Sequence, residues 1–344
     1  MSSNPDRETK SLGDTQPTIY DVAKLAGVSI STVSRVINSP ERVNEITRAK
    51  ILNAIDQLNF VPKAEARARA LQGNHRIGVL SPFYTTLSFV QRLRGIDAVL
   101  TKTNYEMLIY TVDSMNRLIG YLTSLAITGN LDGLIVISLP LSEAVAKRLA
   151  GRGPKIVTIE ASQELFCGVE IDDFYGGKLA ANYLISKGHK LCAFIGDIDP
   201  PDYTIRPVIA RLEGFKQGMS DAGLPLPDHY IHSSNFAQEP TRAAARQLLS
   251  LPDRPSAIFV ATDIQAIIVM KVANELGLKI PQDLAIIGFD DLDIAEYVGL
   301  TTIRQPLDDS GRIAAELLLS QLNDSRRPVQ HVKLPLTVVE RDTV

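Results

Sequence analysis

The stretch "GVSISTVSRVIN", residues 27–38, reads as a tight turn followed by a short amphipathic helix. Gly27 is suited to the left-handed conformation that ends a preceding helix, and Ser29 is suited to the N-cap of the following one. The inward-facing positions expected for this helix pair are Val22, Ala23, Ala26, Val33, Val36 and Ile37. Spacing, turn glycine and cap residue together predict a helix-turn-helix unit.

The outer face of the second helix has the chemistry of a base-reading surface. It presents Ile30, Ser31, Thr32, Ser34 and Arg35. Short side chains permit a close approach to base edges, and an arginine can donate two hydrogen bonds to guanine. Asn44 can cap a third helix, and Pro62 closes the unit. Asn38, Asn44 and Thr47 are placed to reach phosphates, which would position the unit without reading sequence.

Charge is unevenly distributed along the 344 residues, whose formal net charge is −3. Residues 17–76 contain nine Lys/Arg and five Asp/Glu, which gives +4, whereas residues 77–344 carry −6. A basic head on an acidic body is expected where only the head meets phosphates. Residues 1–16 are polar and are expected to form a disordered tail.

Beyond residue 76 the chain alternates short apolar strands with amphipathic helical stretches. The strand-like runs are "RIGVL", "YEMLIYT", "GLIVIS", "KIVTIE", "GVEID", "KLCAFIG", "SAIFVAT" and "LAIIGFD". Helical patterns such as "GKLAANYLISKG" lie between them. This alternation predicts an α/β core of doubly wound parallel sheets, arranged as two lobes with a cleft at the carboxyl ends of the strands.

Composition and missing motifs exclude several classes of protein. The chain is 45% hydrophobic and 22% charged, as in ordinary globular proteins. It has no run of 18 apolar residues and no signal-peptide segment, so neither a membrane partner nor export is expected. Cys167 and Cys192 form no CxxC pair and are expected to be small core residues in a reducing cytoplasm. Without a P-loop, a GxGxxG or a GxSxG motif, or clustered histidines, we expect no enzyme, no cofactor and no metal site.

Motifs spread over nearly the whole chain resemble those of the lactose-repressor/galactose-repressor (LacI/GalR) family of bacterial transcription regulators. "TIYDVAKLAGVSISTVSRVIN" and "NFVP" are similar to the family's headpiece, and "LISKGHKLCAFIGD", "RLEGF", "ATDIQA", "IIGFDDLD" and "LTTIRQP" to its core. The resemblance implies a headpiece at 17–62, a hinge helix or linker at 63–75 and a periplasmic-binding-protein-like core at 76–344. The two lobes of this core are expected at about 76–171 with 305–333, and about 172–304 with 334–344.

The resemblance also implies a homodimer that reads two half-sites of a near-palindromic operator in the major groove of DNA. By position, Ile30 and Ser31 match the family's main base-reading pair, and Arg35 matches a further base contact. The positions that match the family's backbone contacts are Thr18, Tyr20, Ser29, Ser34 and Asn38.

The segment after Pro62 resembles the family's hinge helix, which folds on operator DNA and opens the minor groove with a leucine. In this chain the leucine position is Arg69, and Leu71 lies two residues later. Either Leu71 acts as the wedge in a shifted helix, or Arg69 enters a narrow groove electrostatically. Arg67 is expected to join this minor-groove contact, and Glu65 is an unexpected acid near phosphates.

In the core, the resemblance implies a small effector bound between the lobes. The positions that match effector contacts are Ser88, Glu160, Arg211, Phe236, Thr262, Asp263, Asp290 and Gln305. Arg211 has a planar fork suited to paired hydroxyls or a carboxylate, unless it is only a surface ion-pair partner. Phe236 either stacks on the ligand or belongs to the core. Asp263 and Asp291 have the alternative of capping helices, and Gln305 that of joining the lobes.

These expectations combine into a cytoplasmic, ligand-controlled transcription regulator, a repressor by resemblance. Family members mostly sense sugars, and Asp290 with Arg211 and Phe236 suits a polyhydroxylated ring. A purine, a nucleoside or another small metabolite is the alternative effector. The rival class is a solute-binding protein without DNA function, against which the basic head and the missing export signal count. No leucine-heptad tail follows "LPLTVVERDTV", so we expect a dimer and not a tetramer.

Overall fold

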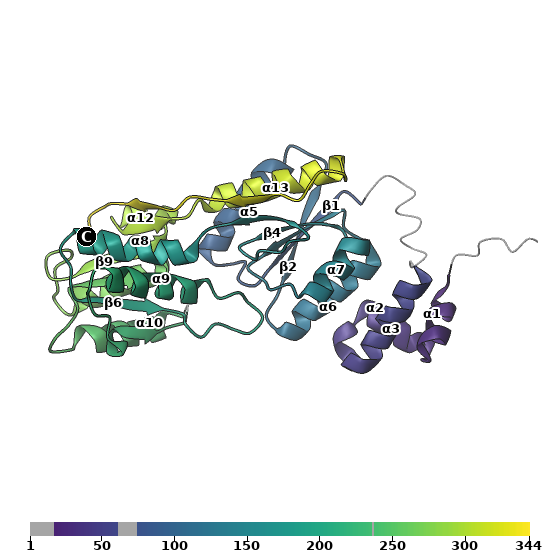
Figure 1. The fold of residues 1–344 in the computed structure, drawn as a ribbon, viewed down its shortest axis with the longest axis horizontal. Coiled ribbons are helices and arrows are strands. Elements are labelled where there is room, and N and C mark those ends of the chain that lie inside the picture. The colour runs from purple at the N-terminus through teal and green to yellow at the C-terminus, as the bar shows by residue number, and fades with distance from the viewer. Residues whose placement is uncertain (1–16, 61–73, 236) are drawn as a thin grey trace, which may run out of the picture. The chain divides into compact units, whose positions relative to one another are not determined.

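The N-terminal headpiece is a small bundle of helices. The computed structural model describes residues 17–60, 74–235 and 237–344 of the chain. In the first of these ranges it contains α1 (Ile19–Ala26), α2 (Ile30–Asn38), the 3₁₀ turn η1 (Pro40–Arg42) and α3 (Glu45–Leu58), shown in purple in Figure 1. The headpiece and most of the core that follows belong to separate compact units.

The caps expected from the sequence form the headpiece's turns. Gly27 ends α1 in the left-handed conformation, with φ of 66°. The Ser29 hydroxyl accepts a hydrogen bond from the Thr32 amide at 3.2 Å, and Asn44 Oδ1 accepts one from the Thr47 amide at 2.8 Å. The buried side chains of the bundle are Val22, Ala23, Val33, Val36, Ile37, Ile51, Ala54, Ile55 and Phe60. The predicted helix-turn-helix is therefore confirmed.

Two six-stranded sheets form the core. The first sheet has the order β11-β5-β4-β3-β1-β2, and the second has the order β12-β10-β9-β8-β6-β7. The strands of the first are β1 (Arg76–Ser81), β2 (Glu106–Thr111), β3 (Gly133–Ile137), β4 (Lys155–Ile159), β5 (Cys167–Glu170) and β11 (His331–Lys333). Those of the second are β6 (Cys192–Gly196), β7 (Ile231–Ser233), β8 (Ala257–Val260), β9 (Ala285–Asp290), β10 (Thr301–Arg304) and β12 (Thr337–Val339).

The sheets have equivalent topologies, because replacing β1–β5 and β11 by β6–β10 and β12 converts one order into the other. We refer to the first sheet with its helices as the first lobe and to the second as the second lobe. The predicted α/β architecture is confirmed, with one difference: β12 pairs with β10 in the antiparallel direction. The eight strands expected from the sequence are present, whereas β7, β10, β11 and β12 were not predicted. These have three or four residues each.

Helices cover the sheets and complete the cores of the lobes (Figure 1). Those of the core are α5 (Leu87–Leu100), α6 (Met115–Thr128), α7 (Glu143–Arg152), α8 (Asp173–Ser186), α9 (Pro207–Asp221), α10 (Gln238–Leu249), α11 (Asp263–Glu275), α12 (Asp293–Tyr297) and α13 (Leu307–Asn323), with the 3₁₀ turn η2 (Asp228–Tyr230). In the first lobe, α5 and α13 pack on one face of the sheet. In the second lobe, α8 and α9 cover one face, and α10 and α11 cover the other. Cys167 and Cys192 are buried and unbridged in these cores, as expected.

Glycines allow two helix pairs to approach unusually closely. Between α5 and α13, a methyl group on Gly95 or Gly311 would collide with a backbone carbonyl of the other helix. The same holds between α8 and α9 for Gly177 and Gly214. The backbones of each pair are therefore in direct contact, which fixes the spacing of the two helices next to their sheet.

The C-terminal segment is tied into the second lobe. The Thr343 hydroxyl donates to the Ile286 carbonyl at 2.7 Å and accepts from the Thr301 amide at 2.9 Å. Arg341 Nη2 donates to Asp291 Oδ1 at 2.7 Å. The last residues of the chain thus support β9 and the acidic pair at its end. In the described part of the chain, no helix has both the length and the apolar character needed to cross a membrane.

Candidate functional site

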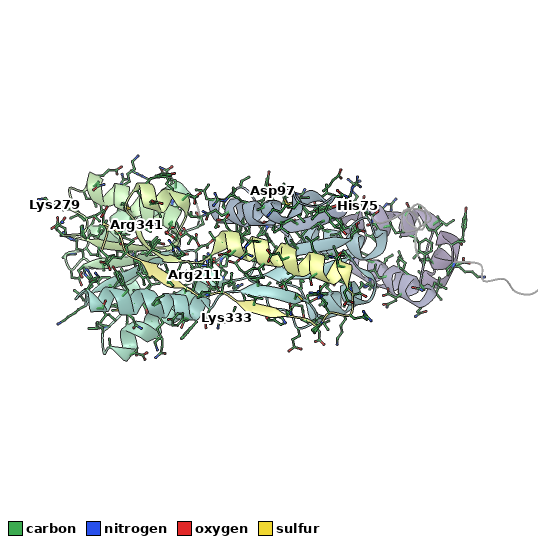
Figure 2. All side chains as sticks on the ribbon, turned by 90° about the horizontal axis from the view of Figure 1, so that it is seen from above. His75, Asp97, Arg211, Lys279, Lys333 and Arg341 are labelled. Atoms are coloured by element: carbon green, nitrogen blue, oxygen red, sulfur yellow. The ribbon has the colours of Figure 1, made fainter. Side chains whose placement is uncertain are left out.

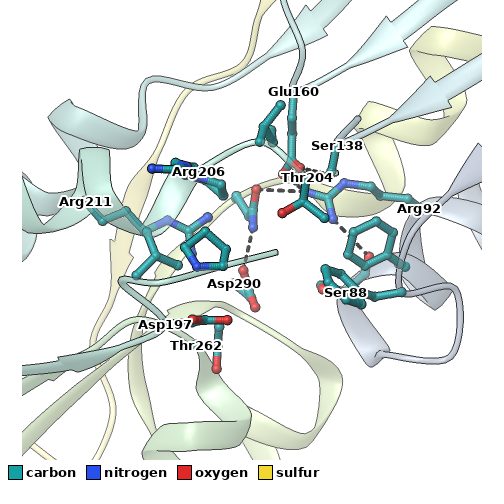
Figure 3. Close-up of a pocket in the computed structure, with 17 residues that line it drawn as sticks. Ser88, Arg92, Ser138, Glu160, Asp197, Thr204, Arg206, Arg211, Thr262 and Asp290 are labelled. Carbon is teal, nitrogen blue, oxygen red and sulfur yellow. Dashed lines mark hydrogen bonds and ion pairs between the residues drawn. The ribbon is translucent and has the colours of Figure 1, made fainter. Parts of the chain in front are cut away.

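A cavity opens at the carboxyl ends of the strands in the core (Figure 3). It contains about 600 Å³ of space not filled by atoms, counted out to its open mouth. Its lining from the first lobe is Phe83, Ser88, Phe89, Arg92, Ser138 and Glu160. Its lining from the second lobe and from the crossing between them is Asp197, Pro200, Thr204, Ile205, Arg206, Pro207, Val208, Arg211, Thr262, Asp290 and Gln305.

The backbone is strained where strands end at the cavity. Ser138 follows β3 with φ of 54°, Glu160 follows β4 with φ of 67°, and Asp290 ends β9 with φ of 120°. A positive φ is unfavourable for residues with a Cβ and tends to mark functional sites, where it directs a side chain. Here three polar side chains are directed into one cavity.

Arg211 is buried and ion-paired, not a surface residue. Its side chain is 4% exposed, and Nε donates to Asp173 Oδ1 at 2.8 Å. Nη1 donates to the Ala261 carbonyl at 2.8 Å, and Cζ lies 3.6 Å from the centre of the Phe289 ring. Burial acts to lower the pKa of Arg211, but Asp173 and Asp290 outweigh it and raise that pKa. The guanidinium is thus a fixed, permanently charged donor in the cavity wall (Figure 2 marks its position in the core).

Asp290 is the buried acceptor beside this arginine. Burial raises the pKa of Asp290 to about 6, although Arg211 and a hydrogen bond from Gln305 act in the opposite direction. Gln305 Nε2 donates to Asp290 Oδ1, and Gln305 Oε1 accepts from Arg92 Nη2 at 3.3 Å. Gln305 lies where the chain crosses from β10 to α13, so it joins the lobes and also lines the cavity. Both alternatives considered for Gln305 therefore agree with its placement.

Arg92 and Glu160 form a second buried ion pair, on the first-lobe side. Arg92 Nη2 donates to Glu160 Oε1, and Glu160 Oε2 accepts from the Ser138 hydroxyl (Figure 3). The side chains of Arg92 and Glu160 are 3% and 8% exposed. Glu160 was expected from the sequence, whereas Arg92 and Ser138 were not. The signals available were the position of Ser138 directly after a strand and the recurrence of the "RLEG" motif as "RLRG" at residues 92–95.

The loop between β6 and α9 forms another wall. Asp197 follows β6, lines the cavity and is buried, which raises its pKa. Thr204 closes a turn by donating from its amide and hydroxyl to the Pro201 carbonyl at 3.1 and 3.0 Å. The Ile205 amide then donates to the Ser138 carbonyl of the first lobe at 3.2 Å. The loop is therefore held against both lobes, and neither Asp197 nor Thr204 was identified from the sequence.

The expected effector residues are only partly brought together. The six that line the cavity are Ser88, Glu160, Arg211, Thr262, Asp290 and Gln305. Asp263 does not line it: Oδ1 accepts from the Thr302 hydroxyl and Oδ2 accepts from the Leu292 amide at 2.8 Å. Asp291 pairs with Arg304 and Arg341 instead of capping a helix. Phe236 lies outside the described residues.

The outer face of α2 carries the expected DNA contacts. Ile30, Ser31 and Arg35 are exposed on α2. On α1, Tyr20 is 67% exposed. Ser34 is partly buried on α2.

Other expected DNA contacts have structural partners of their own. Thr18 donates from its amide and hydroxyl to Asp21 Oδ2, at 2.8 and 2.6 Å, which begins α1 and lowers the pKa of Asp21. Ser29 and Asn44 cap helices, and each keeps an exposed side chain. The side chain of Asn38 and residues Arg67, Arg69 and Leu71, with the preceding Glu65, lie outside the described part of the structure.

Two regions of the chain match models of known families. Residues 18–63 match the model described as bacterial regulatory proteins, lacI family. Residues 181–344 match the periplasmic binding protein-like domain. The first match contains the helix-turn-helix, and the second contains the second lobe from within α8 onward, with α13 and β11 of the first lobe.

Relatives and solved structures extend the similarity over nearly the whole chain. The ribose operon repressor of Escherichia coli (strain K12) is 34% identical over 330 residues, which cover 94% of this chain and 98% of the repressor. The HTH-type transcriptional repressor PurR of Vibrio vulnificus is 33% identical over 334 residues, which cover 95% and 98%. A transcriptional regulator CelR in complex with cellobiose matches with a TM-score of 0.69 and 26% identity, over 95% of this chain and 100% of that one. A LacI family regulator from Enterococcus faecium with bound ribose also matches with a TM-score of 0.69, at 30% identity over 78% and 98%.

Proposed function

The chain belongs to the LacI family of bacterial transcription regulators and is a ligand-responsive DNA-binding regulator; on this basis we propose that it represses transcription from a near-palindromic operator, as a homodimer controlled by a sugar. It is not an enzyme: the relatives that cover its whole length are transcription repressors. Such a regulator works in the bacterial cytoplasm, where the operator lies.

The cavity is the single observation that carries the sugar assignment. Arg211 and Asp290 place a planar donor and a carboxylate acceptor side by side, and Glu160 and Asp197 add further buried carboxylates. Hydroxyl groups satisfy both kinds of partner, because each hydroxyl donates one hydrogen bond and accepts others. These charged groups already have partners in the protein, but a ligand that displaces water from their remaining donors and acceptors must replace the lost hydrogen bonds, which hydroxyl groups do.

Between the two effector classes, the named relatives favour a pentose. The E. coli relative is a ribose operon repressor, and the E. faecium regulator was solved with ribose. A purine or nucleoside is the alternative class. D-Ribose is therefore the first compound to test, followed by other pentoses, hexoses and cellobiose, with guanine and hypoxanthine representing the alternative class.

The headpiece supplies the operator contact in this proposal. Ile30, Ser31 and Arg35 would read base edges in the major groove, while Thr18, Tyr20, Ser29, Ser34, Asn38 and Asn44 would contact the backbone. The segment with Arg67, Arg69 and Leu71 would enter the minor groove. Two headpieces on one dimer would match the two half-sites of the operator.

The effector controls DNA binding through the lobes in this proposal. Sugar in the cavity contacts both lobes and so favours one relative position of them. Residues 63–75 follow each headpiece and lead into the first lobe, so a change in lobe position would alter operator affinity by the coupling free energy between the sites, typically about 1–3 kcal/mol.

Fluorescence anisotropy with labelled promoter fragments tests the proposal. We expect binding that weakens steeply with added salt, because Lys and Arg displace counterions from phosphates, and an affinity that changes several-fold when D-ribose is added. Light scattering of the DNA complex should give two chains per operator. A chain that binds sugar but no promoter fragment at low salt would be a solute-binding protein, and the regulator assignment would fail.

A further inference from the structure

Two helices of the core carry the same short motif. Helix α5 reads Arg-Leu-Arg-Gly at residues 92–95, and α9 reads Arg-Leu-Glu-Gly at residues 211–214. Helix α5 follows β1 and α9 follows β6, and these strands hold equivalent places in their sheets. Arg92 and Arg211 are therefore equivalent positions of the two lobes.

The backbone around each arginine is fixed in the same way. A methyl group on Gly311 of α13 would collide with the carbonyl of Arg92, and one on Gly177 of α8 would collide with the carbonyl of Arg211. In both lobes the arginine thus lies where two helices touch backbone to backbone. The backbone from which each arginine side chain extends is therefore held in place next to its sheet.

The side chains also have equivalent surroundings. Both are at least 96% buried, and both are ion-paired: Arg92 with Glu160 and Arg211 with Asp173. Each guanidinium lies over an aromatic ring, Phe89 at 5.4 Å for Arg92 and Phe289 at 3.6 Å for Arg211. Both line the same cavity.

The carboxylates complete the equivalence. Glu160 directly follows β4 and Asp290 ends β9, which are equivalent strands, and both residues have positive φ. Gln305 connects the two sets, accepting from Arg92 and donating to Asp290. The cavity therefore presents one arginine and one strand-end carboxylate from each lobe (Figure 3).

We propose that Arg92 is a second effector-binding arginine, so that the effector is held by an arginine and a carboxylate of each lobe. The proposal rests on the sugar-sensing function above. Among the described residues, Nε of Arg92 has no hydrogen-bond partner although it is buried, so the ion pair with Glu160 does not use all of its donors. Two such sets require a ligand with hydroxyls on opposite edges, which a sugar ring has and a compound with a single polar edge lacks.

Arg92→Lys in the full-length chain separates this role from a structural one. Lysine keeps the positive charge next to Glu160 but cannot present a planar fork. In isothermal titration with D-ribose, or with whichever neutral pentose or hexose the unaltered chain binds best, we expect affinity to fall at least tenfold. Arg211→Lys should give a similar loss. Arg94→Lys is the matched control on the same helix, because Arg94 is half-exposed, pairs with Asp293 and Asp308 and does not line the cavity; its affinity should stay within twofold.

Deoxy analogues of the bound sugar provide a second measurement that does not depend on stability. At least one missing hydroxyl should weaken binding to the unaltered chain but cost little further affinity in Arg92→Lys, since its partner is already lost. Operator binding without sugar confirms that each variant is folded.

Two results would overturn the proposal: sugar affinity in Arg92→Lys equal to that of the unaltered chain, or equal losses for every deoxy analogue in both proteins. If the unaltered chain binds operator but no sugar, the sugar assignment itself fails, and the role of Arg92 falls with it.

Discussion

Arg211 and Asp173 form an ion pair, 2.8 Å between Nε and Oδ1, from which solvent is almost excluded. Removal of one partner leaves the other charge buried. We expect Arg211→Met to destabilise the core by about 3–5 kcal/mol, and Asp173→Asn in the same chain to restore part of that loss. Urea unfolding of both single variants and the double variant measures the coupling, which we expect to exceed about 1 kcal/mol.

Effector response distinguishes function from stability in the same variants. The double variant should remain folded and bind operator, but D-ribose should no longer change its DNA affinity, because the donor in the cavity is gone. Arg312→Met, which removes an exposed pair with Asp309 on α13, serves as the control and should cost less than about 0.5 kcal/mol. Additive effects of Arg211→Met and Asp173→Asn would show that the pair is not coupled.

Asp290 is expected to reduce the stability of the empty core. Its pKa of about 6 in the folded protein lies above the ordinary value of 3.8, so the folded state binds the proton more tightly than the unfolded state. The free energy of unfolding contributed by this group therefore falls as pH rises from about 4 to 6 and stays low above it. Asp290→Asn should then stabilise the ligand-free protein at pH 7 by about 1–3 kcal/mol.

Asp290→Asn should also weaken effector binding, roughly 10- to 100-fold, because a carboxylate forms stronger hydrogen bonds with hydroxyl groups than a neutral amide does. In the unaltered chain, affinity for D-ribose should fall as pH is lowered through about 6, where Asp290 gains its proton. Titration calorimetry between pH 5 and 8 checks this, and an identical pH profile in Asp290→Asn would contradict the assignment.

Asn44 combines a cap with an expected phosphate contact, and two substitutions separate these roles. Asn44→Ala removes the acceptor of the Thr47 amide and should destabilise α3 by about 1 kcal/mol. Asn44→Asp keeps the cap and suits a helix N-terminus, but it places a negative charge near phosphates. Hydrogen exchange of α3 should therefore quicken only in Asn44→Ala, while operator affinity should fall in both. Undiminished operator binding by Asn44→Asp would place this side chain away from the DNA.

Arg35 is expected to read one base pair. Arg35→Ala should cost about 1–3 kcal/mol of discrimination at that position of the operator and leave the other positions unchanged. Selection from a randomised operator library by the full-length chain measures this. Lys50→Ala on α3, an exposed cation outside the reading face, should lower affinity for all sequences alike if it has any effect. A selected sequence profile unchanged by Arg35→Ala would exclude the base contact.

The headpiece and the long strands were predictable because their signals are local. Gly27, Ser29 and Asn44 act within one turn of chain, and each β-strand of five or six residues has its own apolar run. The strands β11 and β12 have three residues each, and they form by pairing with β5 and β10 at the edges of the two sheets. No local pattern can reveal such an element.

The cavity was predicted less completely because it depends on register between distant segments. Arg211 and Asp290 were found by resemblance, whereas Arg92 was not proposed, although its motif Arg-Leu-Arg-Gly is similar to the Arg-Leu-Glu-Gly at Arg211. Asp263 was expected to contact the effector but does not line the cavity. Its neighbour Thr262 lines the cavity, whereas the first turn of α11 directs Asp263 toward Thr302 and Leu292. A single residue step along a helix rotates a side chain by about 100°, which sequence alone does not resolve.

The attachment of Arg341 and Thr343 to the second lobe has a consequence for synthesis. Bacterial and other ribosomes add about 5–20 residues each second, so the helix-turn-helix leaves the ribosome roughly 15–60 s before residues 331–343 are made. Until then the first sheet lacks β11 and the second sheet lacks β12. Asp291, the neighbour of Asp290, also lacks its partner Arg341. A nascent chain therefore contains all residues of its helix-turn-helix long before it contains all residues that support its effector site.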